Sequence, residues 1–447
     1  MTMRNGKRPR ESDAVLATGD AWESHVDKRP RSDTFNVEDD RRQQREAEVS
    51  RSLGLGAHPP AQPVERPGVP AATDTSAFIV PNRPSPAYRA DDKEGHYVFQ
   101  LGENLTSRYK ILSKMGEGTF GRVLECWDRK HRTYVAIKIV RNVKKYRDAA
   151  MIELEVLNTL EKNDPQNRWH CVHLQEWFDY RGHVCMVFEK LGLSLYDFLR
   201  VNQYRPFKIN VVRDFGRQLL ESVAYLHSLQ LIHTDLKPEN ILLAAIDDER
   251  KSPTPGVRKS APQQPATSQI KVIDFGSATF SDQYHSTVVS TRHYRAPEVI
   301  LGLGWSFEAD IWSIGCILVE LVTGDALFQT HENMEHLAMM EAVLGPIPKS
   351  MAQASKGLHN CFVGRDFRLN WPADASKRSI RVVDKMTGLK QLLRESGEPS
   401  VRPHIDALCN LLQKLLQYQP QQRITAHQAL QHSFFHATYD IVDLTDS

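Results

Sequence analysis

Three polar side chains stand within the otherwise apolar stretch LIHTDLKPENILL, residues 231 to 243. Asp235, Lys237 and Asn240 lie between two segments rich in Leu and Ile, which the pattern predicts to be buried. An aspartate can accept or orient the proton of an incoming hydroxyl, a lysine can neutralise a transferring phosphoryl group, and an asparagine can bind Mg²⁺. The set therefore suits phosphoryl transfer, provided that the chain also holds phosphates and a metal.

A glycine-rich stretch supplies a candidate phosphate site. GEGTFGRV runs from Gly116 to Val123, and its glycines let the backbone approach a phosphate closely and present N–H groups to it. The same letters occur in dinucleotide-binding folds, where they open a helix, whereas a strand-like run follows here. Taken alone, the stretch could equally be an ordinary glycine-rich hairpin.

Two further motifs carry charge toward such a site. VAIK ends in Lys138 on a predicted strand, and a buried cation there needs a carboxylate partner. Glu153 shares the inward face of its predicted helix with apolar residues, whereas Glu155 points about 200° away, so Glu153 is the predicted partner. KVIDFG supplies Asp274, a hard oxygen ligand for Mg²⁺, and Gly276 frees the backbone to turn.

The surrounding elements divide into two kinds. Short β-like runs between about 109 and 190 are interrupted by one helical pattern at 147–161, which predicts a small antiparallel sheet with one main helix. Beyond about 191 the spacing is largely helical, and the apolar run 311–322 is too short to cross a bilayer and predicts a buried helix. The expected fold class is α+β, with a small β lobe at 109–190 and a larger helical lobe at 191–435.

The remaining segments are predicted to lie outside this core. Residues 1–90 are polar and lack periodicity, which predicts a disordered extension; the basic clusters KRPR at 7–10 and 28–31 are candidate nuclear-import signals or simply solvated charge. Residues 91–108 form a lead-in, 244–269 a polar surface insertion between two strands, and 436–447 a tail.

Composition excludes several classes of function. The net charge of +2 gives no overall bias toward nucleic acid or a membrane surface, so we expect no direct binding to either. The six cysteines show no CxxC spacing, which favours reduced thiols in a nuclear or cytosolic protein. No apolar signal core follows the N-terminus. We expect a monomer located in the nucleus, with a share in the cytoplasm left open.

The ordered set of motifs resembles the protein kinases from Tyr109 to Phe435. The glycine-rich loop, VAIK, HxDxKxxN, DFG and APE (Ala296–Glu298) follow one another in that family's order. DLKPEN is similar to the serine/threonine form of the catalytic loop, and STRHYRAPE to the CMGC group. EHLAMMEAVLGPIP, residues 335–348, resembles the signature of the LAMMER, or CDC-like, dual-specificity kinases, except that Ala342 replaces an arginine. The helical spacing of its apolar residues favours a packed helix over a catalytic element.

The resemblance implies a bilobal kinase fold, ATP and Mg²⁺ as cofactors, and specific roles for further residues. Asp310 would brace the catalytic loop, Arg423 would pair with Glu298, and Arg295 would lie beside the substrate site. Lys138, Glu153, Asp235, Lys237 and Asn240 form the implied catalytic set, with Asn240 and Asp274 as metal ligands. Phe188 would stand at the back of the nucleotide pocket, Ile273 would limit the space beneath the base, and Glu189 and Leu191 would offer backbone groups to adenine. The implied nucleotide-binding set comprises Met115, Gly116, Glu117, Gly118, Thr119, Phe120, Gly121, Arg122, Val123, Ala136, Lys138, Phe188, Glu189, Leu191, Leu243 and Asp274.

The expected function is ATP-dependent phosphorylation of Ser and Thr, with Tyr autophosphorylation, on Arg/Ser-rich splicing factors as the resemblance implies. Glu239 matches a position that can meet an arginine two residues before the target. A pseudokinase or scaffold is the alternative, but Lys138, Asp235, Asn240 and Asp274 are all present, and a small-molecule kinase fits the APE segment poorly.

Thr234 occupies the position before the catalytic aspartate, where many kinases carry an arginine that binds a phosphate on the activation segment. A threonine cannot make that contact. We therefore expect the segment from Asp274 to Glu298, including Ser290 and Thr291, to be ordered by packing and by Arg295. In the alternative, Arg292 or Arg295 binds a phosphate on Ser286 or Thr287.

Overall fold

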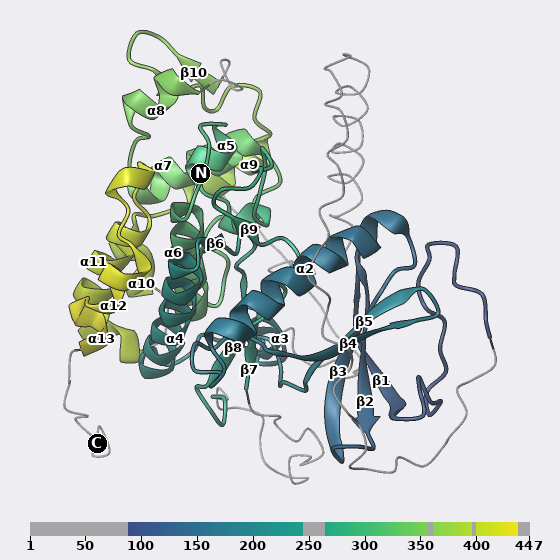
Figure 1. The fold of residues 1–447 in the computed structure, drawn as a ribbon. Helices are drawn as coiled ribbons and strands as arrows, with labels where there is room; N and C mark the ends of the chain where they lie inside the picture. The colour runs from purple at the N-terminus through teal and green to yellow at the C-terminus, as the bar shows by residue number, and fades with distance from the viewer. Residues whose placement is uncertain (1–87, 245–263, 356–360, 396–398, 437–447) are drawn as a thin grey trace, which may run out of the picture. The chain divides into compact units, whose positions relative to one another are not determined.

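The computed structural model describes residues 88–244, 264–355, 361–395 and 399–436, so the predicted N-terminal extension up to residue 87, most of the insertion and the C-terminal tail from 437 lie outside the described residues. Figure 1 shows the arrangement of the helices and strands.

A five-stranded antiparallel sheet forms the N-terminal part of the described chain, in the order β1-β2-β3-β5-β4. Its strands are β1 (Tyr109–Gly118), β2 (Gly121–Asp128), β3 (Thr133–Val140), β4 (Leu174–Tyr180) and β5 (His183–Glu189). Helix α2 (Lys144–Asn163) packs against β3, β4 and β5 (Figure 1). This is the small sheet with one main helix that the sequence predicts.

Helices dominate the rest of the described chain. They are α3 (Leu195–Val201), α4 (Ile209–Ser228), α5 (Pro297–Ile300), α6 (Glu308–Thr323), α7 (Asn333–Leu344), α8 (Lys349–Ala354), α9 (Lys377–Asp384), α10 (Leu389–Glu395), α11 (Ile405–Leu415), α12 (Ala426–Leu430) and α13 (Ser433–His436). The α+β prediction of a small sheet region followed by a helical region is therefore confirmed.

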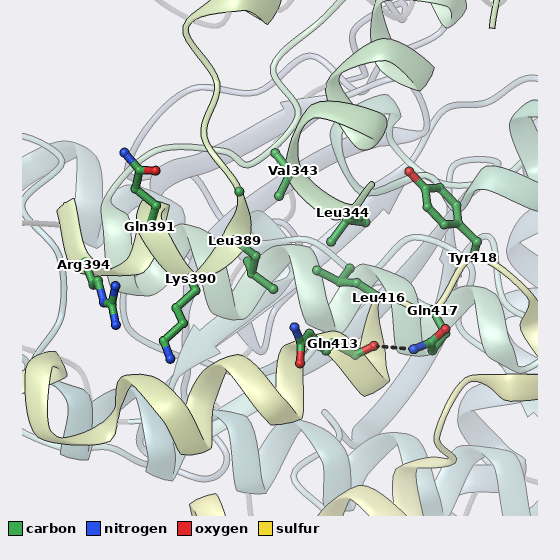
Figure 2. Close-up of a pocket in the computed structure, with 11 residues that line it drawn as sticks. Val343, Leu344, Leu389, Lys390, Gln391, Arg394, Gln413, Leu416, Gln417 and Tyr418 are labelled. Carbon is green, nitrogen blue, oxygen red and sulfur yellow. Dashed lines mark hydrogen bonds between the residues drawn. The ribbon is translucent and has the colours of Figure 1, made fainter. Parts of the chain in front are cut away.

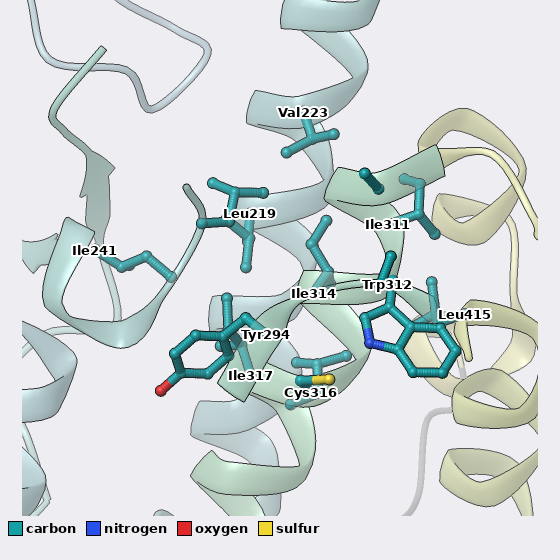
Figure 3. Close-up of a cluster of buried hydrophobic side chains, with 14 of the residues drawn as sticks. Leu219, Val223, Ile241, Tyr294, Ile311, Trp312, Ile314, Cys316, Ile317 and Leu415 are labelled. Carbon is teal, nitrogen blue, oxygen red and sulfur yellow. The ribbon is translucent and has the colours of Figure 1, made fainter. Parts of the chain in front are cut away.

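Helix α6 is the centre of the helical core. All residues from Ala309 to Val322 are buried, as expected for the apolar run, and Figure 3 shows its side chains packed with those of α4 and α11. Close packing requires Gly315, because a Cβ there would lie 2.7 Å from Leu416 Cδ2. The helix ends at Gly324, whose φ of 85° is the left-handed conformation that glycine adopts easily. No helix among the described residues has the length and apolar character needed to span a membrane.

Short strand pairs position the loops that carry the polar motifs. β6 (Leu231–Ile232) pairs with β9 (Thr279–Phe280), and β7 (Ile241–Leu243) pairs with β8 (Ile270–Val272). The predicted insertion thus connects two antiparallel neighbours. A third pair, β10 (Phe362–Val363) and β11 (Arg368–Leu369), lies further along the chain.

Candidate active site

The loop between β6 and β7 carries the catalytic candidates and is fixed by a buried carboxylate from α6. Asp310, 1% exposed, accepts the backbone N–H groups of His233 and Thr234, each at 2.9 Å. Burying a carboxylate requires such donors, and here they also define the path of the loop. The brace expected of Asp310 is thus present.

The Asp235 carboxylate is held by side chains from both sides. Its Oδ2 accepts Lys237 Nζ at 2.7 Å, and the backbone carbonyl of Asp235 accepts Asn240 Nδ2 at 2.9 Å. Its Oδ1 accepts the backbone N–H and the hydroxyl of Thr291, at 3.0 and 2.7 Å. Asn240 Nδ2 also lies 3.5 Å from Oδ2, so the one long, weak contact of the carboxylate is at Oδ2, where a substrate hydroxyl could replace it.

Thr291 is a site residue to which the sequence reasoning gave no contact. Besides bonding Asp235, its hydroxyl accepts Lys237 Nζ at 3.1 Å, so it ties the activation segment to the catalytic loop. The contact joins residues 56 positions apart. Its place five residues before the APE motif is the only sequence signal that could have indicated it.

Lys138 lies between two carboxylates from different parts of the chain. Its Nζ is 2.7 and 2.9 Å from the Glu153 oxygens and 3.2 Å from Asp274 Oδ1. Burial alone would lower the pKa of Lys138, but Glu153 and Asp274 outweigh it and raise that pKa, while Lys138 lowers the pKa of Asp274. Helix α2 thus presents Glu153 to Lys138, as its helical phase predicts, and leaves Glu155 exposed.

Asp274 is oriented by a strained backbone and by its neighbours. It has a φ of 63°, and Thr234 has a φ of 67°, a left-handed conformation that is rare outside glycine. His233 Nε2 lies 3.1 Å from the carbonyl oxygen of Ile273, and its ring lies 5.2 Å from that of the buried Phe275. His233 therefore links the catalytic loop to the DFG motif, a role to which the sequence reasoning assigned no residue.

The glycine-rich loop has one closed side and one open side. A Cβ at Gly121 would lie 2.1 Å from the oxygen of Ile139, so only glycine allows β2 to approach β3 there. At Gly116 and Gly118 a Cβ would meet no atom within 4 Å. The loop tip contacts α2, where the Phe120 and Tyr146 rings lie edge to face at 5.8 Å. The Arg122 guanidinium binds Glu117 and the lead-in segment. Any contribution of Arg122 to nucleotide binding therefore comes from its backbone or from its effect on the position of the loop.

The predicted adenine-binding residues border the end of β5. Ala136 of β3 pairs with Phe188 of β5, and Gly192 N donates to Leu243 O at 2.9 Å, which joins the segment after β5 to β7. Leu191 and Leu243 are buried. Met115 is 41% exposed on β1. Their contacts with a base remain predictions.

The activation segment is ordered by bonds within the chain. Arg295 donates from Nε to Val289 O at 2.9 Å and from Nη2 to Ser290 O at 2.8 Å, and Trp305 Nε1 donates to Ser286 O at 2.8 Å. Arg292 Nη1 donates to Asn333 Oδ1 at 2.6 Å. Both arginines that could have bound a phosphate are therefore engaged by protein oxygens.

Glu298, at the end of this segment, belongs to a fully buried ion pair. Arg423 Nη1 and Nη2 meet the two oxygens of Glu298 at 2.7 and 3.0 Å, and both side chains are at most 1% exposed. A bidentate pair of this kind fixes geometry because both groups must stay paired once they are removed from water. The expected Arg423–Glu298 pairing is present.

A separate cavity of about 630 Å³ lies in the helical region, away from all these residues (Figure 2). Val343 and Leu344 of α7, the start of α10 and the residues after α11 line it. It shares no residue with the predicted site. In the same region, α7 buries Leu337 and Met340 completely, so the LAMMER-like stretch is a packed helix, as predicted.

The residues present fit a Mg²⁺-bound nucleotide. A Cβ at Gly116 or Gly118 would meet no atom within 4 Å, which leaves room for phosphates, and the strand register aligns Gly116 with Val123 and Val123 with Lys138. Asn240 and Asp274 supply oxygen atoms, and the Asp274 side chain keeps 39% of its surface exposed. Lys138 would hold the phosphates, and Asn240 with Asp274 would hold the metal.

The fold and the site together define a phosphotransferase that acts through a braced aspartate, and comparison with known proteins agrees. The family model described as "Protein kinase domain" matches residues 109–435. A crystal structure of a kinase domain superimposes with a TM-score of 0.68 at 38% identity, covering 77% of this chain and all of that one. The chain belongs to the protein kinases and, within the CMGC group, to the LAMMER family.

Named relatives point to the same branch. The serine/threonine-protein kinase AFC3 of Arabidopsis thaliana is 56% identical, covering 78% of this chain and 88% of the relative. The dual specificity protein kinase CLK2 of Homo sapiens is 47% identical over 77% and 67%. The dual specificity protein kinase lkh1 of Schizosaccharomyces pombe is 45% identical over 85% and 53%. This chain is accordingly a serine/threonine protein kinase with dual-specificity relatives, and nothing supports the pseudokinase alternative.

Proposed function

We propose that this kinase uses ATP with Mg²⁺ to phosphorylate Ser and Thr in Arg/Ser-rich splicing factors in the nucleus, and that it autophosphorylates on Tyr. The observation that carries the catalytic part is the convergence of Lys138, Glu153 and Asp274 on one side and Asp235, Lys237 and Thr291 on the other. The substrate class and the location follow from the family resemblance and from the two KRPR clusters.

The chain's own groups account for the chemistry. ATP supplies the γ-phosphoryl group, and Mg²⁺ offsets its charge. Asp235 Oδ2 accepts or orients the proton of the substrate hydroxyl, because Thr291 and Lys237 already fix the rotation of the carboxylate. The Lys237 ammonium, 2.7 Å from that carboxylate, stabilises negative charge on the group in transfer. Lys138 holds phosphates in line, and Glu153 keeps Lys138 in place.

Glu239 supports a preference for arginine near the target residue. It lies in the 3-10 turn Pro238–Asn240, four residues after Asp235, and its side chain is partly exposed although its Oε2 is buried. A guanidinium two residues before the target hydroxyl would meet opposite charge there.

A peptide array tests the substrate class. Purified full-length enzyme is incubated with ATP and Mg²⁺ on Arg/Ser repeats and on matched peptides in which Ala or Lys replaces Arg. We expect selective phosphorylation of serine in the Arg/Ser peptides, and Glu239→Gln should reduce the preference for arginine two residues before the serine. Equal rates on all peptides would reject the proposed substrate class while leaving kinase activity intact.

A further inference from the structure

The lead-in turn, Asp91–Tyr97, is a closed structure docked on the sheet region. Asp92 Oδ1 accepts the N–H groups of Glu94 and His96 at 3.0 and 2.9 Å. Asn142 N donates to Gly95 O at 2.8 Å. Tyr97 is 5% exposed, and its ring lies edge to face with those of Tyr180 and His183. These contacts fix the turn to the sheet region, and none of them involves a residue of the predicted nucleotide-binding set.

Arg122 connects this turn to the ascending side of the glycine-rich loop. Its Nη2 donates to Asp92 Oδ2 at 3.0 Å, its Nη1 to Tyr97 O at 2.9 Å, and its Nε to Glu117 Oε2 at 2.9 Å. Only 18% of the Arg122 side chain is exposed. Hydrogen bonds and charge from Arg122, with a smaller contribution from Lys114, lower the pKa of Glu117 to about 2.

Arg141 makes a second connection, to the loop tip. Its Nε donates to Glu94 O at 2.7 Å and its Nη1 to Thr119 O at 3.0 Å. Its guanidinium also lies 4.8 Å from the centre of the Tyr146 ring, against which Phe120 packs. Both arginines therefore reach from the same seven-residue turn to different points of one loop.

We propose that the lead-in turn positions the glycine-rich loop, and that the hydrogen bonds of Arg122 and Arg141 connect the turn to the loop. The loop itself offers little packing there, because a Cβ at Gly116 or Gly118 would meet no atom within 4 Å and the β1–β2 register shifts between Lys114 and Gly116. A loop held in place loses less conformational entropy when phosphates bind. The turn contacts neither Asp235 nor Lys138 in the described structure, so its effect falls on nucleotide affinity rather than on the transfer step. The proposal rests on the proposed use of ATP.

Asp92→Asn tests the hydrogen bond between Arg122 and Asp92 with little change to the shape of the side chain. The amide oxygen can still accept the two turn N–H groups, but an NH₂ group now faces the Arg122 guanidinium, and two donors repel. In the full-length enzyme we expect the KM for ATP to rise three- to tenfold, with kcat within twofold. Amide hydrogen exchange of residues 117–121 should speed up by a similar factor. Arg122→Gln should raise the KM at least as much, because it also removes the bonds to Tyr97 O and Glu117. Adding Asp92→Asn to it should change little, because the Asp92–Arg122 bond is already absent.

The matched control is Asp148→Asn, which makes the same change in an exposed pair with Lys144 on α2. It should alter neither KM nor exchange. If Asp92→Asn folds poorly, Arg141→Lys takes its place, because a single ammonium cannot bridge Glu94 O and Thr119 O. Unchanged KM and loop exchange in a folded Asp92→Asn or Arg141→Lys enzyme would overturn the proposal, as would a loss confined to kcat. Wild-type enzyme inactive with ATP would reject the proposed function instead, and loop exchange would still decide the positioning role.

Discussion

Removal of all phosphate from the activation segment should leave this kinase active. The Thr234 hydroxyl donates to Ser277 O at 2.8 Å. Thr234 stands where many kinases have an arginine that binds a phosphate on this segment. Arg295 satisfies the carbonyls of Val289 and Ser290, and Trp305 satisfies that of Ser286. Every one of these bonds uses groups of the chain itself, so dephosphorylation removes none of them.

The expected size of the effect follows from those contacts. Each such bond contributes roughly 1 kcal/mol net, and together they offset part of the entropy lost on ordering the segment. A phosphate-dependent switch could cost a hundredfold in rate, about 2.7 kcal/mol, whereas we expect a change within threefold, about 0.65 kcal/mol. The assay is phosphatase treatment, mass spectrometry to confirm an unmodified segment, and initial rates on an Arg/Ser peptide. A hundredfold loss that returns on rephosphorylation would refute the interpretation of Thr234.

Thr234→Val probes the same bond directly. Valine keeps the β-branched shape at a φ of 67° but removes the Thr234 donor from the Ser277 carbonyl. That carbonyl keeps the longer bond from Thr279 Oγ1 at 3.3 Å and Ser277 is exposed, so the cost should be no more than about 1 kcal/mol. That cost corresponds to at most a roughly fivefold fall in rate. Thr287→Val makes the same change at an exposed position of the segment and should have no effect.

Three other predictions test separate features. Asp235→Asn should keep nucleotide binding but lower kcat by about two to four orders of magnitude in steady-state assays, and Lys138→Met should also impair activity; near-normal turnover by Asp235→Asn would reject its assignment. Deleting residues 1–90 should leave the rate on a short peptide unchanged and reduce nuclear accumulation in fluorescence imaging; a fully nuclear deletion form would place the import signal elsewhere. Burial, aided by nearby cations, lowers the pKa of His336 well below 6.5, so the folded chain loses stability as the pH falls below about 6.5, where the unfolded chain binds the proton. His336→Leu should flatten this loss by about 1 kcal/mol between pH 6.5 and 5.5 in denaturant unfolding, and an equal slope in both proteins would contradict it.

Local spacing predicted much of the site because some contacts depend on one element. Glu153 was identified from helical phase alone, and the structure pairs it with Lys138. The Lys138–Asp274 contact spans 136 positions, and only the family resemblance could bring these residues together. Apolar patterning predicted the strands and the buried helix α6, because apolar residue types indicate which positions are buried.

Side-chain direction was harder to predict than membership of a motif. Arg122 and Val123 are neighbours on β2, so their side chains point to opposite faces of the sheet and cannot both face a nucleotide. The motif suggested both, whereas the structure turns the Arg122 guanidinium to Asp92 and Tyr97. Such a partner lies in a segment outside the recognised motifs, and no local spacing indicates it.

The contact between the activation segment and the catalytic loop also determines which phosphorylation sites in the segment could be activating. Ser290 has a left-handed backbone, with a φ of 67°, and Arg295 holds its carbonyl at 2.8 Å. This strained residue directly precedes Thr291, whose hydroxyl lies 2.7 Å from Asp235 Oδ1. A phosphate on Thr291 would place about −1.5 to −2 charges against the catalytic carboxylate and remove the donor that orients it. Phosphorylation there would oppose catalysis, so an activating phosphate would have to lie earlier in the segment, at exposed positions such as Ser286 or Thr287.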